Sequence, residues 1–210
     1  MDVSSLISFL LAAMALTIMP GPDNIFVLTE SITKGKRNGI AVSAGLASGV
    51  IVHTFIVASG LALFVQTSPT IFNFIKYFGA AYLFYLVYST LKEKSGNPTK
   101  DISETETSVQ KERFSKLVKQ GFLMNVLNPK VTLFFIAFLP QFVSKTGYPF
   151  EIQTGVLGLI FMLQAFIVFS SIAVVSTILI AYVKSDFFWQ KVKWIKVSVL
   201  SVLAVLLIFK

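Results

Sequence analysis

The hydrophobic residues of the chain fall into long continuous runs rather than into the short alternating segments of a water-soluble domain. A helix needs about 20 apolar residues to cross roughly 30 Å of hydrocarbon. Six runs come close to this length or exceed it, at residues 4–29, 39–66, 70–91, 117–143, 153–183 and 192–209. The pattern therefore predicts an all-α polytopic membrane protein with about six transmembrane helices.

Proline interrupts two of these runs, the first and the fourth. The first contains Pro20, Gly21 and Pro22, and the fourth contains Asn128 and Pro129. Proline has no amide donor and ends or kinks a helix, which leaves backbone groups without helical partners. Inside a membrane such groups are tolerated only where they meet protein, water or ligand. We therefore expect two broken helices that either line a site or are simple kinks produced by helix packing.

A central segment of different composition divides the chain. Residues 93–116 contain ten charged residues and seven serines or threonines, too polar a mixture to bury a core. We interpret this segment as a loop within one transmembrane domain, residues 1–210, between halves 1–92 and 117–210. With three helices each, the halves must enter the membrane from opposite sides. If they are duplicates they form inverted repeats, as in many secondary transporters.

Positive charges are strongly biased toward one side of the predicted helices. Of the 18 lysines and arginines, thirteen lie in the segments after the first, third and fifth runs, whereas Lys145 and Lys210 are on the other side. Positive loops face the cytoplasm. The bias predicts a cytoplasmic loop at 93–116 and both termini outside. The first run follows Asp2 without a basic segment, so we expect it to stay in the mature protein.

Composition narrows the function classes further. Hydrophobic residues make up 55% of the chain and charged residues only 13%, against about 25% charged in soluble domains. The net charge of +8 belongs to the loops, so it indicates topology control and not nucleic-acid binding. There is no cysteine and a single histidine, so disulfides are excluded and a metal site is not expected.

Two opposite charges lie inside the membrane runs, and each directly follows the proline of its break. Asp23 is eleven residues before Lys34, and Lys130 is eleven residues after Lys119. At 1.5 Å per residue, both lie about 16 Å from the cytoplasmic edge. A carboxylate at this depth can hold an ammonium group or a proton, and a lysine can hold a carboxylate. Intramembrane charges indicate function, but a structural ion pair or snorkelling side chains would also fit.

Three further polar residues are candidates. Asn24 and Asn125 lie next to the two breaks and could line the same site. His53, in the second run, could relay protons, or it could be a packed, hydrogen-bonded residue. Ser48 is five positions before His53, a spacing that does not place the two on one helix face. The chain therefore offers no nucleophile–base pair, and we do not expect an enzyme.

Small residues give the second run a narrow face. Gly45 and Gly49 are four positions apart, a spacing that favours close helix packing. The same kind of face also allows a homodimer.

The motifs around the breaks resemble a known family. The strongest match is Met-Pro-Gly-Pro-Asp-Asn at residues 19–24, followed by Gly-Phe-Leu-Met-Asn at 121–125 and Asn-Pro-Lys at 128–130. The segments Phe-Gly-Ala-Ala-Tyr-Leu at 78–83 and Leu-Pro-Gln-Phe at 139–142 add to it. Together they resemble, in order and over essentially the whole chain, the amino-acid exporters of the lysine exporter / homoserine–threonine resistance (LysE/RhtB) family.

This resemblance implies secondary-active export of amino acids or close analogues across the bacterial cytoplasmic membrane. It implies coupling to the proton motive force or to exchange, with no cofactor, and with the amino acid, protons and the lipid bilayer as partners. The family's motifs carry over to Pro20, Gly21 and Pro22 and to residues 128–130. Basic, neutral and branched amino acids all remain open as substrates. A channel or a non-transporting scaffold is the alternative, although a scaffold would not need opposite charges at two breaks.

Overall fold

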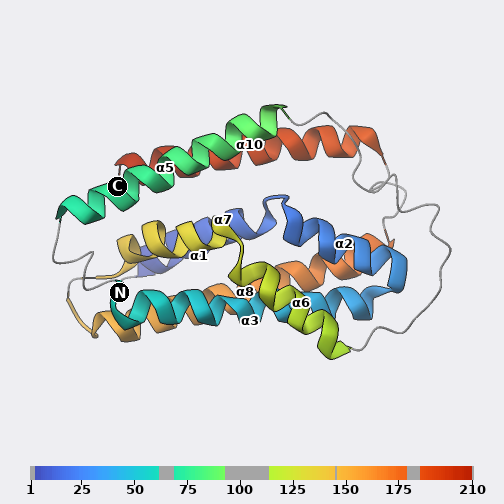
Figure 1. Ribbon diagram of the computed structural model, residues 1–210, viewed down its shortest axis with the longest axis horizontal. Helices are drawn as coiled ribbons and strands as arrows, with labels where there is room; N and C mark the ends of the chain where they lie inside the picture. Colours follow the sequence, from blue (N-terminus) through green and yellow to red (C-terminus); the bar gives the residue numbers. More distant parts are fainter. Residues whose placement is uncertain (1–2, 62–68, 93–113, 145, 179–184, 210) are drawn as a thin grey trace.

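The computed structural model describes residues 3–61, 69–92, 114–144, 146–178 and 185–209, and every regular element in these ranges is helical (Figure 1). The predicted loop is described only from residue 114 onward, so its remainder lies outside the described residues. The elements are α1 (Val3–Ile18), α2 (Pro22–Lys34), α3 (Lys36–Ile56), η1 (Val57–Leu61), α5 (Pro69–Lys92), α6 (Phe114–Val126), α7 (Pro129–Leu133), η3 (Phe134–Phe138), η4 (Leu139–Phe142), α8 (Phe150–Ile178) and α10 (Asp186–Phe209).

In the described part of the chain, five of the six predicted membrane spans correspond to helices or bent helix pairs that are long and apolar enough to cross a bilayer. Among the described residues, three spans, in α3, α8 and α10, are long and apolar enough to cross a bilayer. Two bent pairs pass the same test when each is taken as one span, with bends of 59° between α1 and α2 and 51° between α6 and α7–η4. The remaining predicted span is α5, a 24-residue helix that packs along α10. The all-α, polytopic class and the two proline breaks are confirmed.

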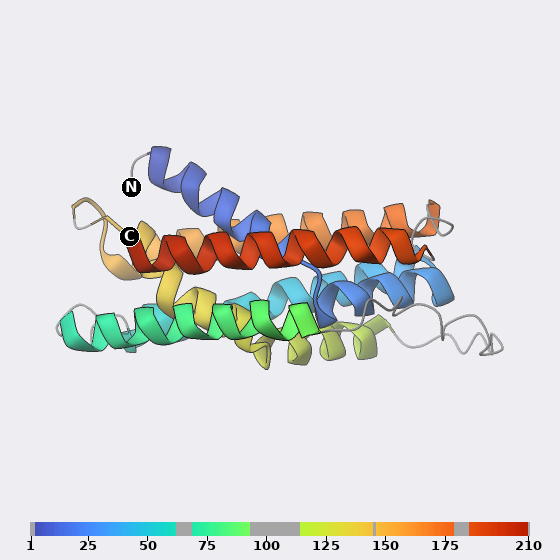
Figure 2. The same cartoon turned by 90° about the horizontal axis from the view of Figure 1, so that it is seen from above.

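The chain crosses the molecule back and forth, and its two termini lie at the same end in both views (Figures 1 and 2). The opposite end holds the junction of α2 and α3 and the starts of α6 and α10, and the last turns of α5 point toward it. Lys34, Lys36, Lys92, Lys116 and Lys191 belong to these segments. The charge bias found along the sequence is thus a bias between the two ends of the folded molecule.

Part of the helix pairing has the same form when the two halves are exchanged. In the first half, α3 packs on α6, the first part of the second broken helix. In the second half, α8 packs on α1 and α2, which form the first broken helix. The equivalent helices α3 and α8 also pack on each other, as do α5 and α10. Inverted repeats require this pairing, and the duplication itself stays a prediction.

Glycines bring α3 and α6 into backbone contact. A Cβ atom built on Gly45 would lie 2.1 Å from the carbonyl oxygen of Val118, and one built on Gly121 would lie 2.4 Å from that of Val42. Both distances are far below van der Waals contact, so only glycine fits at either position. The small-residue face predicted for the second run is therefore a helix-packing surface within the chain.

Aromatic rings fill the space between α1, η3 and α8. Phe134 lies 6.0 Å from Phe9 and 5.5 Å from Phe161 between ring centroids, and Phe135 meets Phe161 edge-on at 5.1 Å. All four side chains are buried. Pairs of this kind add about 0.5–1.5 kcal/mol each beyond their area burial. This cluster fixes the second broken helix against the first.

Candidate functional site

The first break brings a carboxylate to the start of a helix in the protein interior. α1 ends at Ile18 and α2 begins at Pro22, the residue that lacks an amide hydrogen and suits the first helical position. Asp23 follows in the first turn and is only 3% exposed. The positive end of the α2 dipole favours a negative charge here. The Pro20-Gly21-Pro22 break therefore stabilises the position of a buried acid.

The second break is built from its own three-residue motif. Asn128 is the N-cap of α7, where its side-chain Oδ1 accepts a hydrogen bond of 3.0 Å from the backbone nitrogen of Lys130. Pro129 occupies the first helical position. The sequence Asn-Pro-Lys is thus a capping motif: asparagine satisfies a free amide, and proline has none to satisfy.

Two hydrogen bonds join the two breaks, both donated by the second half and accepted by the first. Asn128 Nδ2 donates to Asp23 Oδ2 at 2.6 Å, across 105 residues of sequence. Lys130 Nζ donates to the backbone oxygen of Leu16 at 3.1 Å, in the last turn of α1. The second half of the chain therefore supplies the donors for two acceptors at the first half's break. The sequence predicted the depth of these residues, and the structure places them together.

The predicted charges meet indirectly. No nitrogen–oxygen contact within 4.0 Å joins Asp23 and Lys130 in the described part of the chain. Their shared neighbour is Asn128, whose side chain bonds to the carboxylate on one side and to the Lys130 backbone on the other. Gly21 also lies beside Lys130, since a Cβ built there would be in ordinary van der Waals contact with Lys130 Nζ at 3.7 Å.

A second polar cluster surrounds the end of α1. Asn24 Nδ2 donates to the backbone oxygen of Thr17 at 3.0 Å, and Gln164 Nε2 donates to the Thr17 hydroxyl at 2.9 Å. The other amide oxygens, Asn24 Oδ1 and Gln164 Oε1, are buried and have no partner among the described residues. Of these three residues the sequence analysis selected only Asn24. The feature of the sequence that could have indicated Gln164 is its polar amide inside a long apolar run.

His53 and Asn125 lie at the second break. His53 Nε2 is 3.1 Å from the backbone oxygen of Asn125, which also accepts a bond from the Asn128 backbone nitrogen at 2.9 Å. The histidine ring packs 5.7 Å from that of Phe135. Asn125 Oδ1 is buried without a partner in the described part of the chain. The contacts of His53 are those of a packed, hydrogen-bonded residue that supports the break.

The space beside Lys130 is small. A cavity of about 10 Å³ is lined by Lys130 and otherwise by apolar residues and one glycine of α1, α5, α7, η3 and α10. This volume holds at most one water molecule. In this conformation the cavity beside Lys130 is therefore too small for an amino acid.

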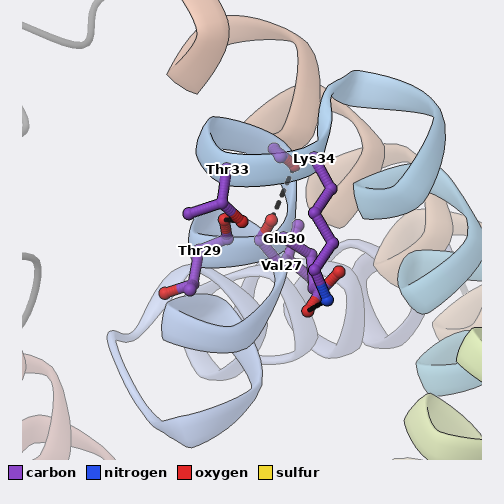
Figure 3. Close-up of polar contacts among 6 residues, drawn as sticks. Val27, Thr29, Glu30, Thr33 and Lys34 are labelled. Atoms are coloured by element: carbon purple, nitrogen blue, oxygen red, sulfur yellow. Dashed lines mark hydrogen bonds and ion pairs between the residues drawn. The ribbon is translucent and has the colours of Figure 1, made fainter. Parts of the chain in front are cut away.

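A second acidic residue, Glu30, is also buried, just past the end of the first predicted run at residue 29. Glu30 is 6% exposed and lies on α2, which continues to Lys34, past the end of the predicted run. Its Oε1 is 3.1 Å from Lys34 Nζ, and the two side chains point toward each other in Figure 3. In the sequence, Lys34 indicates a solvent-exposed helix end at this point, so the burial of Glu30 was not predicted.

Comparison with known proteins identifies the family of the chain. Residues 14–210 match the family described as LysE type translocator. The chain is 32% identical over 144 residues to proteins named leucine efflux protein from Salmonella choleraesuis (strain SC-B67) and Salmonella typhimurium, covering 67% of this chain and 64% of each relative. A leucine efflux protein of Klebsiella pneumoniae is 27% identical over 187 residues, covering 87% of this chain and 84% of the relative.

The similarity is therefore known through sequence, since no solved structure matches the chain. The match to the Salmonella proteins spans just under two thirds of their length. The family match, in contrast, begins before the first break and runs to the last residue. The chain belongs to the LysE type translocator family.

Proposed function

We propose that this protein is a secondary-active exporter of amino acids, and that leucine and similar apolar amino acids are its first candidate substrates. The observation that carries the proposal is the hydrogen bonding between the two helix breaks, which brings one buried carboxylate and one ammonium group to the meeting point of the two halves. The names of the leucine efflux relatives support the substrate class.

The charges of Asp23 and Lys130 assign these residues their roles in substrate binding. A zwitterionic amino acid has a carboxylate for Lys130 and an ammonium group for Asp23, and both residues now hold neutral partners that a charged ligand can replace. The apolar lining beside Lys130 suits an aliphatic side chain once the cavity widens. Asn128 then acts as the positioning residue between the two charges.

Coupling to protons would use the same carboxylate. A proton and a substrate ammonium compete for Asp23, so substrate release to the outside allows protonation and return of the empty carrier. We also propose that the protein lies in a bacterial cytoplasmic membrane, with both termini outside and residues 93–116 in the cytoplasm. The charge bias between the two ends of the molecule supports this orientation. A homodimer remains part of the proposal.

The test is counterflow in proteoliposomes preloaded with single amino acids. We expect saturable exchange of leucine and weaker exchange of lysine. In the Asp23→Asn variant we expect weakened exchange that no longer depends on a pH gradient. A Lys130→Met variant should lose exchange of zwitterionic substrates.

The outcomes separate the alternatives. Non-saturable flux without counterflow would indicate a channel. Absence of exchange for every amino acid, from protein that is monodisperse in detergent, would favour the scaffold. An Asp23→Asn variant that retains full pH-driven efflux would overturn the coupling mechanism while leaving the exporter in place.

A further inference from the structure

The ion pair between Glu30 and Lys34 is incomplete. Glu30 Oε1 receives the Lys34 ammonium at 3.1 Å, but Oε2 is buried and has no partner among the described residues (Figure 3). An ionised carboxylate can accept about four hydrogen bonds. A buried charge whose second oxygen is unsatisfied carries a large desolvation cost. The carboxylate is therefore under-bonded in this conformation.

Glu30 is also aligned with the site at the breaks. Asp23 and Glu30 are seven residues apart on α2, which places them on one face of the helix and about 10.5 Å apart along its axis. Both are buried. Glu30 lies toward the end of α2 that meets Gly35 and Lys36, the basic end of the molecule. One helix face thus leads from this end to the break by way of two carboxylates.

Lys34 bonds to only one of the two carboxylate oxygens of Glu30, whereas a free ligand could bond to both. The lysine is tethered one turn away on the same helix, and its side chain is 37% exposed, whereas that of Glu30 is 8% exposed. Its ammonium has the three-donor chemistry of an amino acid's α-ammonium group. An untethered ammonium can bridge both oxygens, and the displaced lysine can extend its charged end into water.

We propose that Glu30 is a loading site for the ammonium group of the exported amino acid on the basic, cytoplasmic side, and that Lys34 holds this site until substrate displaces it. The proposal rests on the exporter function proposed above. It adds a first binding site, which takes up the substrate before the substrate reaches Asp23.

The test uses two variants with opposite expected effects. The measured quantity is the half-saturation concentration of leucine in inverted membrane vesicles, whose outer medium faces the cytoplasmic surface. Lys34→Gln removes the internal competitor and should lower this concentration about two- to fivefold, the range of a partly exposed ion pair. Glu30→Gln removes the charged acceptor and should raise it about tenfold or more. In right-side-out vesicles both variants should stay within about twofold of wild type, because the site then faces the lumen.

Two controls separate the local effect from general ones. Lys36→Gln removes an exposed positive charge near the same end without touching Glu30, and should leave half-saturation unchanged. Thr33→Val removes the Thr33 hydroxyl bond to the Thr29 carbonyl, 2.7 Å in the same turn, and should also have no effect.

A purely structural ion pair predicts a different result. Both variants would then lower thermal stability, and Lys34→Gln would leave half-saturation unchanged or raise it, which overturns the proposal. If Glu30→Gln does not fold, the direction of change in Lys34→Gln still decides. Wild-type vesicles that show no amino-acid exchange would refute the exporter function itself, a result distinct from failure of the loading site.

Discussion

A single side chain, that of Asn128, joins both broken helices. Its oxygen caps α7 and its nitrogen donates to Asp23. Because the side-chain oxygen and nitrogen have different partners, substitution can separate the cap from the contact with Asp23.

Asn128→Asp should keep the cap and lose the bond to Asp23. Aspartate caps helices about as well as asparagine, but it would place a second carboxylate against Asp23, where the two repel or share one proton. We expect a folded protein whose leucine counterflow falls about tenfold or more. Asn128→Ala, which loses cap and contact together, should also lose about 1 kcal/mol of stability. Full exchange in Asn128→Asp would show that the contact has no role in transport.

We expect His53 to stabilise the structure and to have no role in transport. His53→Gln retains a donor for the Asn125 carbonyl, and counterflow is expected to remain within about twofold of wild type. His53→Leu removes that donor, but the carbonyl keeps its bond from the Asn128 backbone, so the loss of stability should be only about 1 kcal/mol. Thermal melting in detergent and counterflow together check this. Normal melting with abolished exchange in both variants would instead assign His53 a transport role.

For single residues, the sequence predicts the depth in the membrane but not which side chains lie in contact. The depth of Asp23 and Lys130 follows from residue counts, since a helix has a constant rise. The rotation of each helix about its axis depends on packing, so the sequence could not show that Asn128 would lie between the charges. The burial of Glu30 was not predicted, because a lysine one turn later, Lys34, is typical of an exposed helix end.

Among the elements, the glycine contact between α3 and α6 positions the second break. Gly45→Ala and Gly121→Ala should each force the two backbones apart, because the new methyl groups would meet backbone oxygens that cannot rotate away. We expect a loss of about 1–3 kcal/mol, as for other overpacked positions, measured as a lower melting temperature. Gly155→Ala is the matched control, since its Cβ would meet nothing within 4 Å and alanine favours the helix. Equal melting of all three variants would contradict the close crossing.

Element type was predictable where proline or hydrophobic length determines it. The breaks at Pro22 and Pro129 follow from the missing amide donors. The π-helices η1 and η3 were not predicted. Their segments are apolar, and a run that is apolar on all sides shows no periodicity from which α and π turns could be told apart.

For the molecule as a whole, orientation can be measured with introduced thiols, because the chain has no cysteine. Tyr148 is 72% exposed in the connection before α8, at the end that holds the termini, and Lys36 lies at the opposite end. A membrane-impermeant maleimide should label a Tyr148→Cys variant in intact cells and a Lys36→Cys variant only after permeabilisation. The reverse pattern would invert the proposed topology.

The bonding of the breaks also has a consequence for how the protein is made. The first half leaves the ribosome before residue 128 exists, so Asp23 and the Leu16 carbonyl enter the bilayer without the donors that they have in the finished fold. The second half supplies both of these donors. A truncated product therefore carries an uncompensated charge in lipid and becomes a target for membrane proteolysis, whereas two halves translated as separate chains can protect each other only by assembling.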